Sequence, residues 1–386
     1  MNTPPALPRR ETGHPEASAP SRKGVVRVMI VDDSLTVRTI FKRMVESDPA
    51  MVVAATASSA ERALAQLGDS AIDVVLLDLE MPGMGGLAGL PELLEASPGL
   101  QVLVVSSLTE DGAQATLEAL STGAADTMLK PRPGGFNDEY RTQLLDKIKA
   151  LGMPASADDA AACEAANTKS DGLAAVNPKH ERRAKTPQVL AIGASTGGIH
   201  ALNLMLRKLG PEFTLPILIT QHLPSSFIPV FARQIEVASG RPTHIAEDGT
   251  EIRPGEVAIA TGHGHMVVRR MGNRLIARIS DEPARSGCLP SVDPMLSSLA
   301  RVCDGHTLAI ILSGMGRDGL AGAEEIVAAG GSVWAQDVET SAVWGMPGAV
   351  AKAGLATYVA SPDRIGEALM ARSREWSARR DAVKPA

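Results

Sequence analysis

Short apolar runs alternate with amphipathic segments along most of this chain. The N-terminal part carries five such runs, at Val25–Val31, Met51–Thr56, Val74–Leu77, Val102–Val105 and Thr127–Leu129. Runs that are apolar throughout are typical of strands in a parallel sheet that helices cover on both faces. Between the first two runs the apolar residues have helical spacing, at Val37, Ile40, Phe41, Met44 and Val45. The pattern predicts a doubly wound α/β domain over residues 25–150.

The same pattern repeats after residue 187. Further apolar runs occur at Val189–Ile192, Leu215–Ile219, Leu308–Leu312 and Ser332–Ala335. Three other segments favour antiparallel pairing: Glu256–Ala260, and the pair Met266–Arg270 and Arg274–Ile279, which meet at a Gly272-Asn273 turn. We therefore expect two doubly wound parallel sheets, a flavodoxin-like domain followed over residues 187–375 by a Rossmann-like domain with a short antiparallel hairpin.

Polar segments flank and separate the two predicted domains. Residues 1–24 are rich in Pro, Ala, Glu and Ser, and we expect a disordered leader there. Residues 151–186 lose the apolar periodicity and end in a charged run, which predicts a linker that orders only against a neighbouring domain. Residues 376–386 form a polar tail.

Composition narrows the classes of function. The net charge of −6 provides no basic field that would favour nucleic acid. The three cysteines, at 163, 288 and 303, are odd in number and widely separated, so we expect no disulfide framework and no paired metal motif. No apolar run reaches the roughly 18 residues that a membrane span needs, and residues 1–24 lack the apolar core of a signal peptide. We expect a cytoplasmic monomer without membrane insertion.

Polar side chains follow the strands of the first predicted domain. Asp32 and Asp33 end the first run, Asp78 the third, Ser106 the fourth and Lys130 the fifth. Ligands bind at the carboxyl ends of such strands, so we expect these groups to converge. Three carboxylates repel one another unless a divalent cation bridges them, and a site of oxygen ligands alone favours magnesium. Lys130 and Ser106 can then hold an added phosphoryl group.

These residues stand in motifs of a known family. The motifs are Val31-Asp32-Asp33-Ser34, Asp78-Leu79-Glu80-Met81-Pro82, Ser106-Ser107-Leu108-Thr109 and Lys130-Pro131. On them, residues 25–150 resemble the receiver domain of bacterial response regulators. The resemblance implies that Asp78 accepts a phosphoryl group from a histidine kinase, with Asp32 and Asp33 helping to hold magnesium. Gly85 departs from the usual Asp, and Thr127 replaces the usual aromatic switch residue.

The second domain opens on a serine turn. Gly193-Ala194-Ser195-Thr196-Gly197 fits the G-x-S-x-G pattern of a nucleophile elbow, in which small residues let a strand reverse into a helix. The first N–H groups of that helix would face whatever Ser195 attacks. The same stretch is compatible with a phosphate-binding turn or with close helix–strand packing. A dinucleotide site would carry an acidic residue at the end of the next strand, where Gln221-His222 stands instead.

A serine nucleophile needs an imidazole to take its proton and a carboxylate to orient that imidazole. Of the eight histidines, His222 ends the strand after the elbow, and Asp318 ends the Gly-rich loop after Leu308–Leu312. The sequence therefore predicts that Ser195, His222 and Asp318 meet on one rim, in a chain order unlike that of α/β-hydrolases. The backbone N–H groups of Thr196 and Met315 are the candidate oxyanion donors.

Other chemically capable residues are expected to lie outside this triad. His200 falls inside the helix after the elbow and is predicted to point away. His263 and His265 share a Gly-rich loop but have no third metal ligand at suitable spacing. Cys288 lies in a loop and is expected to be inert, as small loop cysteines usually are.

The second domain also resembles a known family. The motifs are Ile192-Gly193-Ala194-Ser195-Thr196-Gly197-Gly198, Gln221-His222-Leu223-Pro224, Pro290-Ser291-Val292-Asp293, Gly314-Met315-Gly316-Arg317-Asp318-Gly319 and Ala335-Gln336-Asp337 with Gly345-Met346-Pro347. On them, residues 187–375 resemble the catalytic domain of chemotaxis-type protein-glutamate methylesterases fused to a receiver. The resemblance implies a nucleophile at Ser195, a base at His222 and an orienting acid at Asp318. This sequence departs from the family pattern at Cys288-Leu289, where His-Arg is common.

The resemblance implies a substrate and a form of control. The substrate would be methylated glutamates of chemoreceptors, with methanol as product, and receptor glutamines would be deamidated by the same chemistry without a cofactor in the catalytic domain. We expect the resting receiver to cover part of the rim near Ser195. The competing hypothesis is a response regulator without enzymatic activity, whose second domain only binds a partner.

Overall fold

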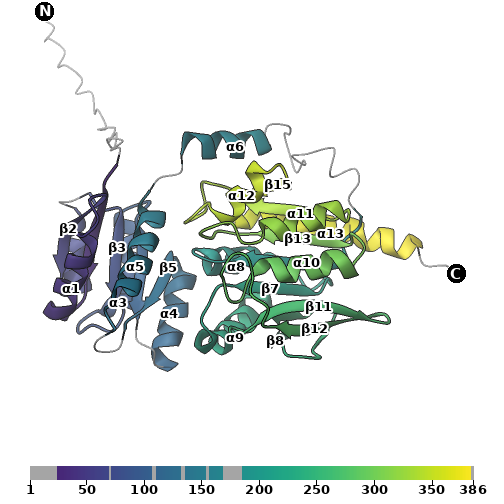
Figure 1. Ribbon diagram of the computed structural model, residues 1–386, viewed down its shortest axis with the longest axis horizontal. Coiled ribbons are helices and arrows are strands. Elements are labelled where there is room, and N and C mark those ends of the chain that lie inside the picture. The colour runs from purple at the N-terminus through teal and green to yellow at the C-terminus, as the bar shows by residue number, and fades with distance from the viewer. Residues whose placement is uncertain are drawn as a thin grey trace, which may run out of the picture.

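The computed structural model describes residues 24–68, 71–106, 110–131, 135–153, 156–167 and 185–383. The expected leader up to residue 23, the motif residues 107–109 and most of the charged run before residue 185 lie outside the described residues. The described chain forms two α/β domains that lie side by side. The first runs from purple to blue and the second from teal to yellow in Figure 1. No helix among the described residues is long and apolar enough to cross a membrane.

The first sheet is parallel and has the strand order β2-β1-β3-β4-β5. Its strands are β1 (Val26–Val31), β2 (Met51–Ala57), β3 (Val74–Asp78), β4 (Gln101–Ser106) and β5 (Asp126–Leu129). The helices between and after them are α1 (Leu35–Val45), α2 (Ala60–Leu67), α3 (Gly85–Ala96), α4 (Glu110–Thr122) and α5 (Asp138–Gly152). Side chains define two helix starts: Ser34 accepts a hydrogen bond from the N–H of Val37, and Asn137 from that of Tyr140. The doubly wound prediction is confirmed here.

The second sheet has seven parallel strands in the order β15-β14-β13-β6-β7-β10-β8. Its strands are β6 (Val189–Ala194), β7 (Ile217–Gln221), β8 (Thr243–Ile245), β10 (Val257–Ile259), β13 (Thr307–Ile311), β14 (Ser332–Gln336) and β15 (Ala356–Ala360). The helices are α8 (Gly198–Leu206), η1 (Ser225–Phe227), α9 (Ile228–Ser239), α10 (Val292–Val302), α11 (Leu320–Ala328), α12 (Met346–Lys352) and α13 (Pro362–Val383). Parallel strands bring the ends of β6, β7 and β13 to one edge of this sheet.

One strand prediction is partly wrong. The predicted hairpin forms as β11 (His265–Met271) and β12 (Arg274–Ser280), and it pairs with β9 (Glu251–Ile252) in a small antiparallel sheet. Glu256–Ala260, expected to be antiparallel, instead forms β10 and lies parallel between β7 and β8. All three residues of β10 are buried, as in a strand covered on both faces, and this separates it from the half-exposed hairpin.

Two segments predicted to be polar connections carry helices. In the expected linker, α6 (Ala157–Asn167) packs against α12 and β15, with Cys163 buried and Lys352 paired to Asp159. This helix lies across the second domain in Figure 1. At the other end, α13 continues into the expected tail as far as Val383, and Trp376, the first residue of that tail, is buried against the domain core.

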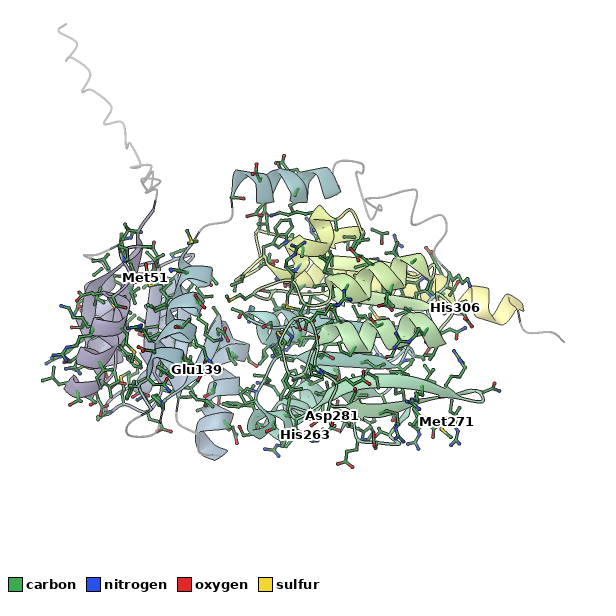
Figure 2. All side chains as sticks on the ribbon, in the orientation of Figure 1. Met51, Glu139, His263, Met271, Asp281 and His306 are labelled. Atoms are coloured by element: carbon green, nitrogen blue, oxygen red, sulfur yellow. The ribbon has the colours of Figure 1, made fainter. Side chains whose placement is uncertain are left out.

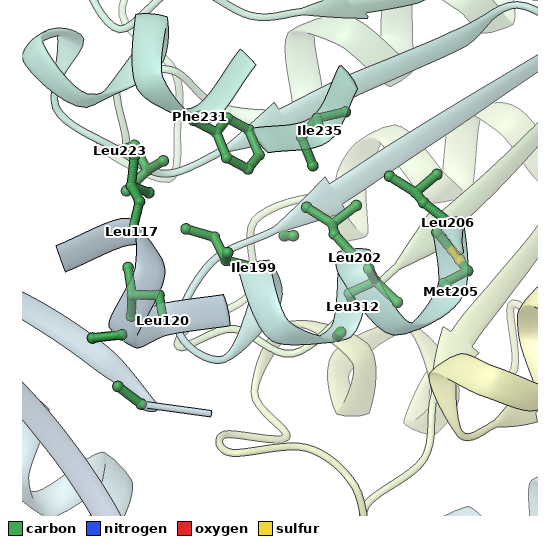
Figure 3. Close-up of a cluster of buried hydrophobic side chains, with 14 of the residues drawn as sticks. Leu117, Leu120, Ile199, Leu202, Met205, Leu206, Leu223, Phe231, Ile235 and Leu312 are labelled. Atoms are coloured by element: carbon green, nitrogen blue, oxygen red, sulfur yellow. The ribbon is translucent and has the colours of Figure 1, made fainter. Parts of the chain in front are cut away.

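The two domains share one apolar cluster. Leu117 and Leu120 of α4 are buried together with Ile199 and Leu202 of α8 and with Phe231 of α9, as Figure 3 shows. Polar contacts surround this cluster: Gln234 donates to the carbonyl of Leu117, and Asn203 donates to the hydroxyl of Ser121. The first domain is therefore packed against the helix that follows Ser195.

Backbone packing inside the first domain makes a stability prediction. A Cβ at Gly86, near the start of α3, would lie 1.9 Å from the carbonyl oxygen of Asp78. Gly86→Ala should therefore lower the free energy of unfolding by about 1–3 kcal/mol, the usual cost of overpacking. A Cβ at Gly68 meets nothing within 4 Å, so Gly68→Ala is the matched control. Urea unfolding of the two variants tests this, and equal stabilities would contradict it.

Candidate active site

The serine turn joins β6 to α8. The register that pairs Ala194 with Gln221 puts Ser195 and His222 directly after neighbouring strand ends. The N–H of Ser195 donates to the carbonyl of Ser313 at 3.0 Å, and the amide of Gln221 donates to the carbonyl of Ser195 at 2.9 Å. The next turn requires glycine because Gly197 has a φ of +75° and a Cβ there would lie 2.7 Å from Ala342.

His222 and Asp318 are brought together, as the sequence predicts. The Nε2 of His222 lies 2.8 Å from a carboxylate oxygen of Asp318, although the two residues are 96 positions apart. The N–H of His222 donates to the carbonyl of Ala194, which ties the imidazole-bearing residue to the elbow strand. His222 keeps 16% of its side chain exposed and Asp318 only 1%, so the imidazole is open to solvent on one side and supported by a buried charge on the other.

Asp318 is held by four further donors. The hydroxyl of Ser291 donates at 2.7 Å, and the N–H groups of Val292, Asp293 and Gly319 donate at 2.7, 3.3 and 3.0 Å. Two of these N–H groups belong to the first turn of α10, where free donors favour an anion. Burial raises the pKa of Asp318, but the hydrogen bond and charge of His222 and these donors lower it overall, to about 2.

The imidazole of His222 is electrostatically tuned by two neighbours. Burial of the ring lowers its pKa, whereas hydrogen bonding to Asp318 and then to Cys288 raises it. The net result is a pKa raised to about 9. The sulfur of Cys288, a ring nitrogen of His222 and a carboxylate oxygen of Asp318 lie within 4.8 Å of one another. The approach of Cys288 to His222 could not be predicted from the sequence, because the spacing of Cys288 matches no metal or nucleophile motif.

Ser195 lies on the same rim without a hydrogen bond to His222. A Cβ at Gly314 would lie 2.8 Å from the Cβ of Ser195, so the serine packs against the loop that leads to Asp318. Within the described part of the chain, the hydroxyl of Ser195 makes no hydrogen bond to His222. Catalytic hydrogen bonds are often long or misaligned before substrate binds, so this geometry does not exclude a nucleophilic serine.

The candidate oxyanion donors differ from the neighbouring N–H groups, which already donate to carbonyl oxygens. The N–H of Ser195 donates to Ser313, that of Gly197 to Ala125, and that of Gly314 to Val343. Among the described residues, the N–H groups of Thr196 and Met315 have no such acceptor. They are therefore available to a developing oxyanion.

Three other histidines are hydrogen-bonded to residues other than Ser195, His222 and Asp318. The Nδ1 of His200 lies 2.8 Å from the carbonyl of Ser121 in the first domain. His263 hydrogen-bonds Thr261, and the Nδ1 of buried His265 accepts the N–H of Ser291, so His265 supports the residue that donates to Asp318. Figure 2 places His263 at the carboxyl edge and His306 at the opposite end of the domain.

The acidic residues of the first domain converge at the carboxyl edge of its sheet. Oxygens of Asp32, Asp33 and Asp78 lie within 4.8 Å of one another. The Nζ of Lys130 lies 2.6 Å from Asp78 and 3.0 Å from Asp32. Burial raises the pKa of Asp78, Lys130 lowers it and Asp32 raises it, with a raised net value. The buried hydroxyl of Ser106 has no hydrogen-bond partner among the described residues, so this cluster fits a bridging cation and an oxyanion ligand.

The first domain contacts the serine turn directly. The hydroxyl of Thr196 donates to the carboxylate of Asp126 at 2.6 Å, and the N–H of Gly197 donates to the carbonyl of Ala125 at 2.6 Å. Lys147 of α5 also pairs with Asp126. Nothing in the sequence marks Asp126 as functional, because its partner is 70 residues away in the other domain. Beside it, the buried hydroxyl of Thr127 has no partner among the described residues.

Comparison with known proteins adds a family assignment to this geometry. The family model described as CheB methylesterase matches residues 190–369, and the one described as response regulator receiver domain matches residues 28–135. A protein-glutamate methylesterase/protein-glutamine glutaminase of Rhodopseudomonas palustris strain HaA2 is 40% identical over 364 residues, which cover 89% of this chain and 93% of that protein. A second, from Caulobacter vibrioides, is 41% identical and covers 90% and 99%. The crystal structure of the Thermotoga maritima CheB methylesterase catalytic domain has 34% identity and a TM-score of 0.47, covering 48% of this chain and 99% of that one.

The tuning of His222 makes a titration prediction. Because Cys288 is one cause of the raised pKa, Cys288→Ala should lower the pH at which the imidazole titrates from about 9 toward neutrality. NMR of ring-labelled histidine measures this midpoint, with His222→Gln to assign the resonance. Cys303→Ala removes a buried cysteine away from the rim and should leave the midpoint unchanged. An unchanged or higher midpoint in Cys288→Ala would refute the coupling.

Proposed function

The chain belongs to the protein-glutamate methylesterase/protein-glutamine glutaminase family, with a response-regulator receiver domain in the same chain, and on this premise we propose how it acts. It hydrolyses glutamate methyl esters of chemoreceptors to glutamate and methanol, and it deamidates receptor glutamines. The observation that carries the proposal is the hydrogen bond between His222 and buried Asp318, formed beside the turn that presents Ser195.

The proposed reaction is acyl transfer through Ser195. As the serine hydroxyl attacks the ester carbonyl, His222 takes its proton, and the resulting imidazolium is stabilised by the charge of Asp318. The carbonyl oxygen becomes an oxyanion, which the N–H groups of Thr196 and Met315 stabilise. His222 then returns the proton to the leaving methoxide, and methanol departs. Water repeats the sequence on the acyl-enzyme and frees the glutamate and Ser195.

A glutamine side chain enters the same sequence with a different leaving group. Attack by Ser195 gives a tetrahedral intermediate of the same shape, and His222 protonates the departing nitrogen so that ammonia leaves instead of methanol. This proton transfer matters more for the glutamine than for the ester, because an unprotonated amide nitrogen is a poorer leaving group than methoxide. No cofactor is needed for either reaction.

The receiver would supply phosphorylation-dependent control. Asp78 is the proposed phosphoacceptor, and a histidine kinase is its proposed phosphodonor. We propose that the protein acts as a monomer in the cytoplasm. Asp32, Asp33 and Asp78 would hold magnesium, which offsets charge on the phosphoryl oxygens. Lys130 would then pair with the phosphoryl group, and the partnerless hydroxyl of Ser106 would donate to it.

A triad makes a distinctive prediction for mutants. Ser195→Ala and His222→Ala should each lower methanol release from methylated receptor by several orders of magnitude, and the double variant should lose little more because the residues act as a unit. Asp318→Asn should lose less than either. Losses that add on a logarithmic scale would argue against a triad, and full methanol release by Ser195→Ala would favour the partner-binding alternative.

Contact between the domains supports gating by the receiver. Asp126 accepts a hydrogen bond from Thr196, and Ala125 accepts one from Gly197. Thr196 and Gly197 are the two residues that connect Ser195 to α8. A receiver held here stands next to the proposed nucleophile and constrains the backbone that carries one oxyanion donor. Phosphorylation adds about −1.5 to −2 charge beside Lys130, repacking the receiver surface and weakening the contact.

This gating predicts the effect of removing the contact. A protein that begins at Thr186 should show raised basal esterase activity and no response to a phosphodonor, whereas full-length Asp78→Asn should stay at the resting level. Asp126→Ala should raise basal activity because the acceptor for Thr196 is lost. Asp146→Ala, an exposed carboxylate on the same domain, is the control. If the shortened protein is no faster than the resting full-length enzyme, obstruction by the receiver is wrong.

A further inference from the structure

The rim of the proposed active site carries a set of potential metal ligands, and one of them, Cys288, has no part in the proposed esterase reaction. Within the described residues two sets of acidic, histidine or cysteine side chains have their ligand atoms within 4.8 Å of one another. One is the all-carboxylate set of the receiver. The other combines the sulfur of Cys288, a nitrogen of His222 and an oxygen of Asp318.

The loop that carries Cys288 is fastened to the triad. The N–H of Cys288 donates to the hydroxyl of Ser286, which donates to Ser291, which in turn donates to Asp318. Gly287 has a φ of +71° and gives the turn that brings the next residue back toward His222. Cys288 itself is half-buried, so its sulfur is held in position while a solute can still reach it.

The ligand chemistry of this set differs from that of the receiver. Thiolate and imidazole favour zinc and similar soft or borderline cations, whereas magnesium prefers oxygen. Asp318 already accepts hydrogen bonds on both oxygens, including one from His222. A carboxylate behind an imidazole is the arrangement that fixes the tautomer and direction of metal-binding histidines. Asp318 would thus orient His222, leaving Cys288 and the imidazole as the ligands.

We propose that Cys288 and His222 form a binding site for a thiophilic divalent cation such as Zn²⁺, with Asp318 orienting the imidazole. Binding releases the thiol proton, and the cation then occupies the imidazole that would otherwise accept the proton of Ser195. The bound cation therefore inhibits hydrolysis. The inhibition rests on the proposed function, but the binding does not.

A spectroscopic titration tests the binding without using activity. Full-length protein is titrated with Co²⁺ in excess Mg²⁺, which occupies the carboxylates of the receiver. Wild type and Cys303→Ala should develop thiolate-to-cobalt charge-transfer absorption that Zn²⁺ removes, and Cys288→Ala should not. Absence of the band in wild type, or its persistence in Cys288→Ala, overturns the site.

Esterase assays with graded Zn²⁺ then test the consequence. Each variant is compared with its own zinc-free rate, and half-inhibition of Cys288→Ala should need at least about tenfold more Zn²⁺ than wild type or Cys303→Ala. Equal sensitivity of all three proteins overturns the inhibition. If the cobalt band forms as expected but wild type releases no methanol, the proposed function fails and the cation site stands.

Discussion

A buried carboxylate in the loop after β13, that of Asp318, organises the rim of the proposed active site. An unpaired charge in the position of Asp318 would cost several kcal/mol, and the protein offsets this with donors from α10, from Ser291 and from His222. These donors come from two separate stretches of chain, so satisfying Asp318 fixes the start of α10 and the imidazole of His222 together. The position of His222, the proposed base, thus depends on the hydrogen bonds that stabilise the buried charge of Asp318.

The same rim is joined to the receiver through the backbone of the serine turn. Gly197 cannot carry a side chain because Ser313 and Ala342 lie too close, and this bare turn lets Ala125 of the receiver approach its N–H. The buried leucines of α4 supply apolar contact beside it. The contact to Thr196 is made by Asp126, and the residue that follows Asp126 is the small Thr127 instead of an aromatic residue. The proposed regulation thus relies on the contacts of Ala125 and Asp126 with the serine turn rather than on an aromatic switch residue.

The two clusters of potential metal ligands differ in ligand type. The receiver offers carboxylate oxygens and a lysine, which suit magnesium and a phosphoryl group, while the catalytic rim offers sulfur and nitrogen. The substitution of Cys288-Leu289 for the usual His-Arg leaves the triad intact and changes what surrounds His222. A thiol in this position raises the pKa of the imidazole and provides the sulfur of the proposed cation site.

The sequence by itself determined the elements and the local chemistry. Runs that are apolar throughout predict the parallel strands. Because parallel strands align their carboxyl ends, the polar residues that follow the strands are predicted to share an edge in each domain. These are Asp32 and Asp78 in the first domain, and Ser195, His222 and Asp318 in the second. Tertiary structure alone decided what depends on contacts across long separations. The parallel pairing of β10, the packing of α6, the bond from Thr196 to Asp126 and the approach of Cys288 to His222 have no local signature, since each is set by which surfaces the folded chain brings together.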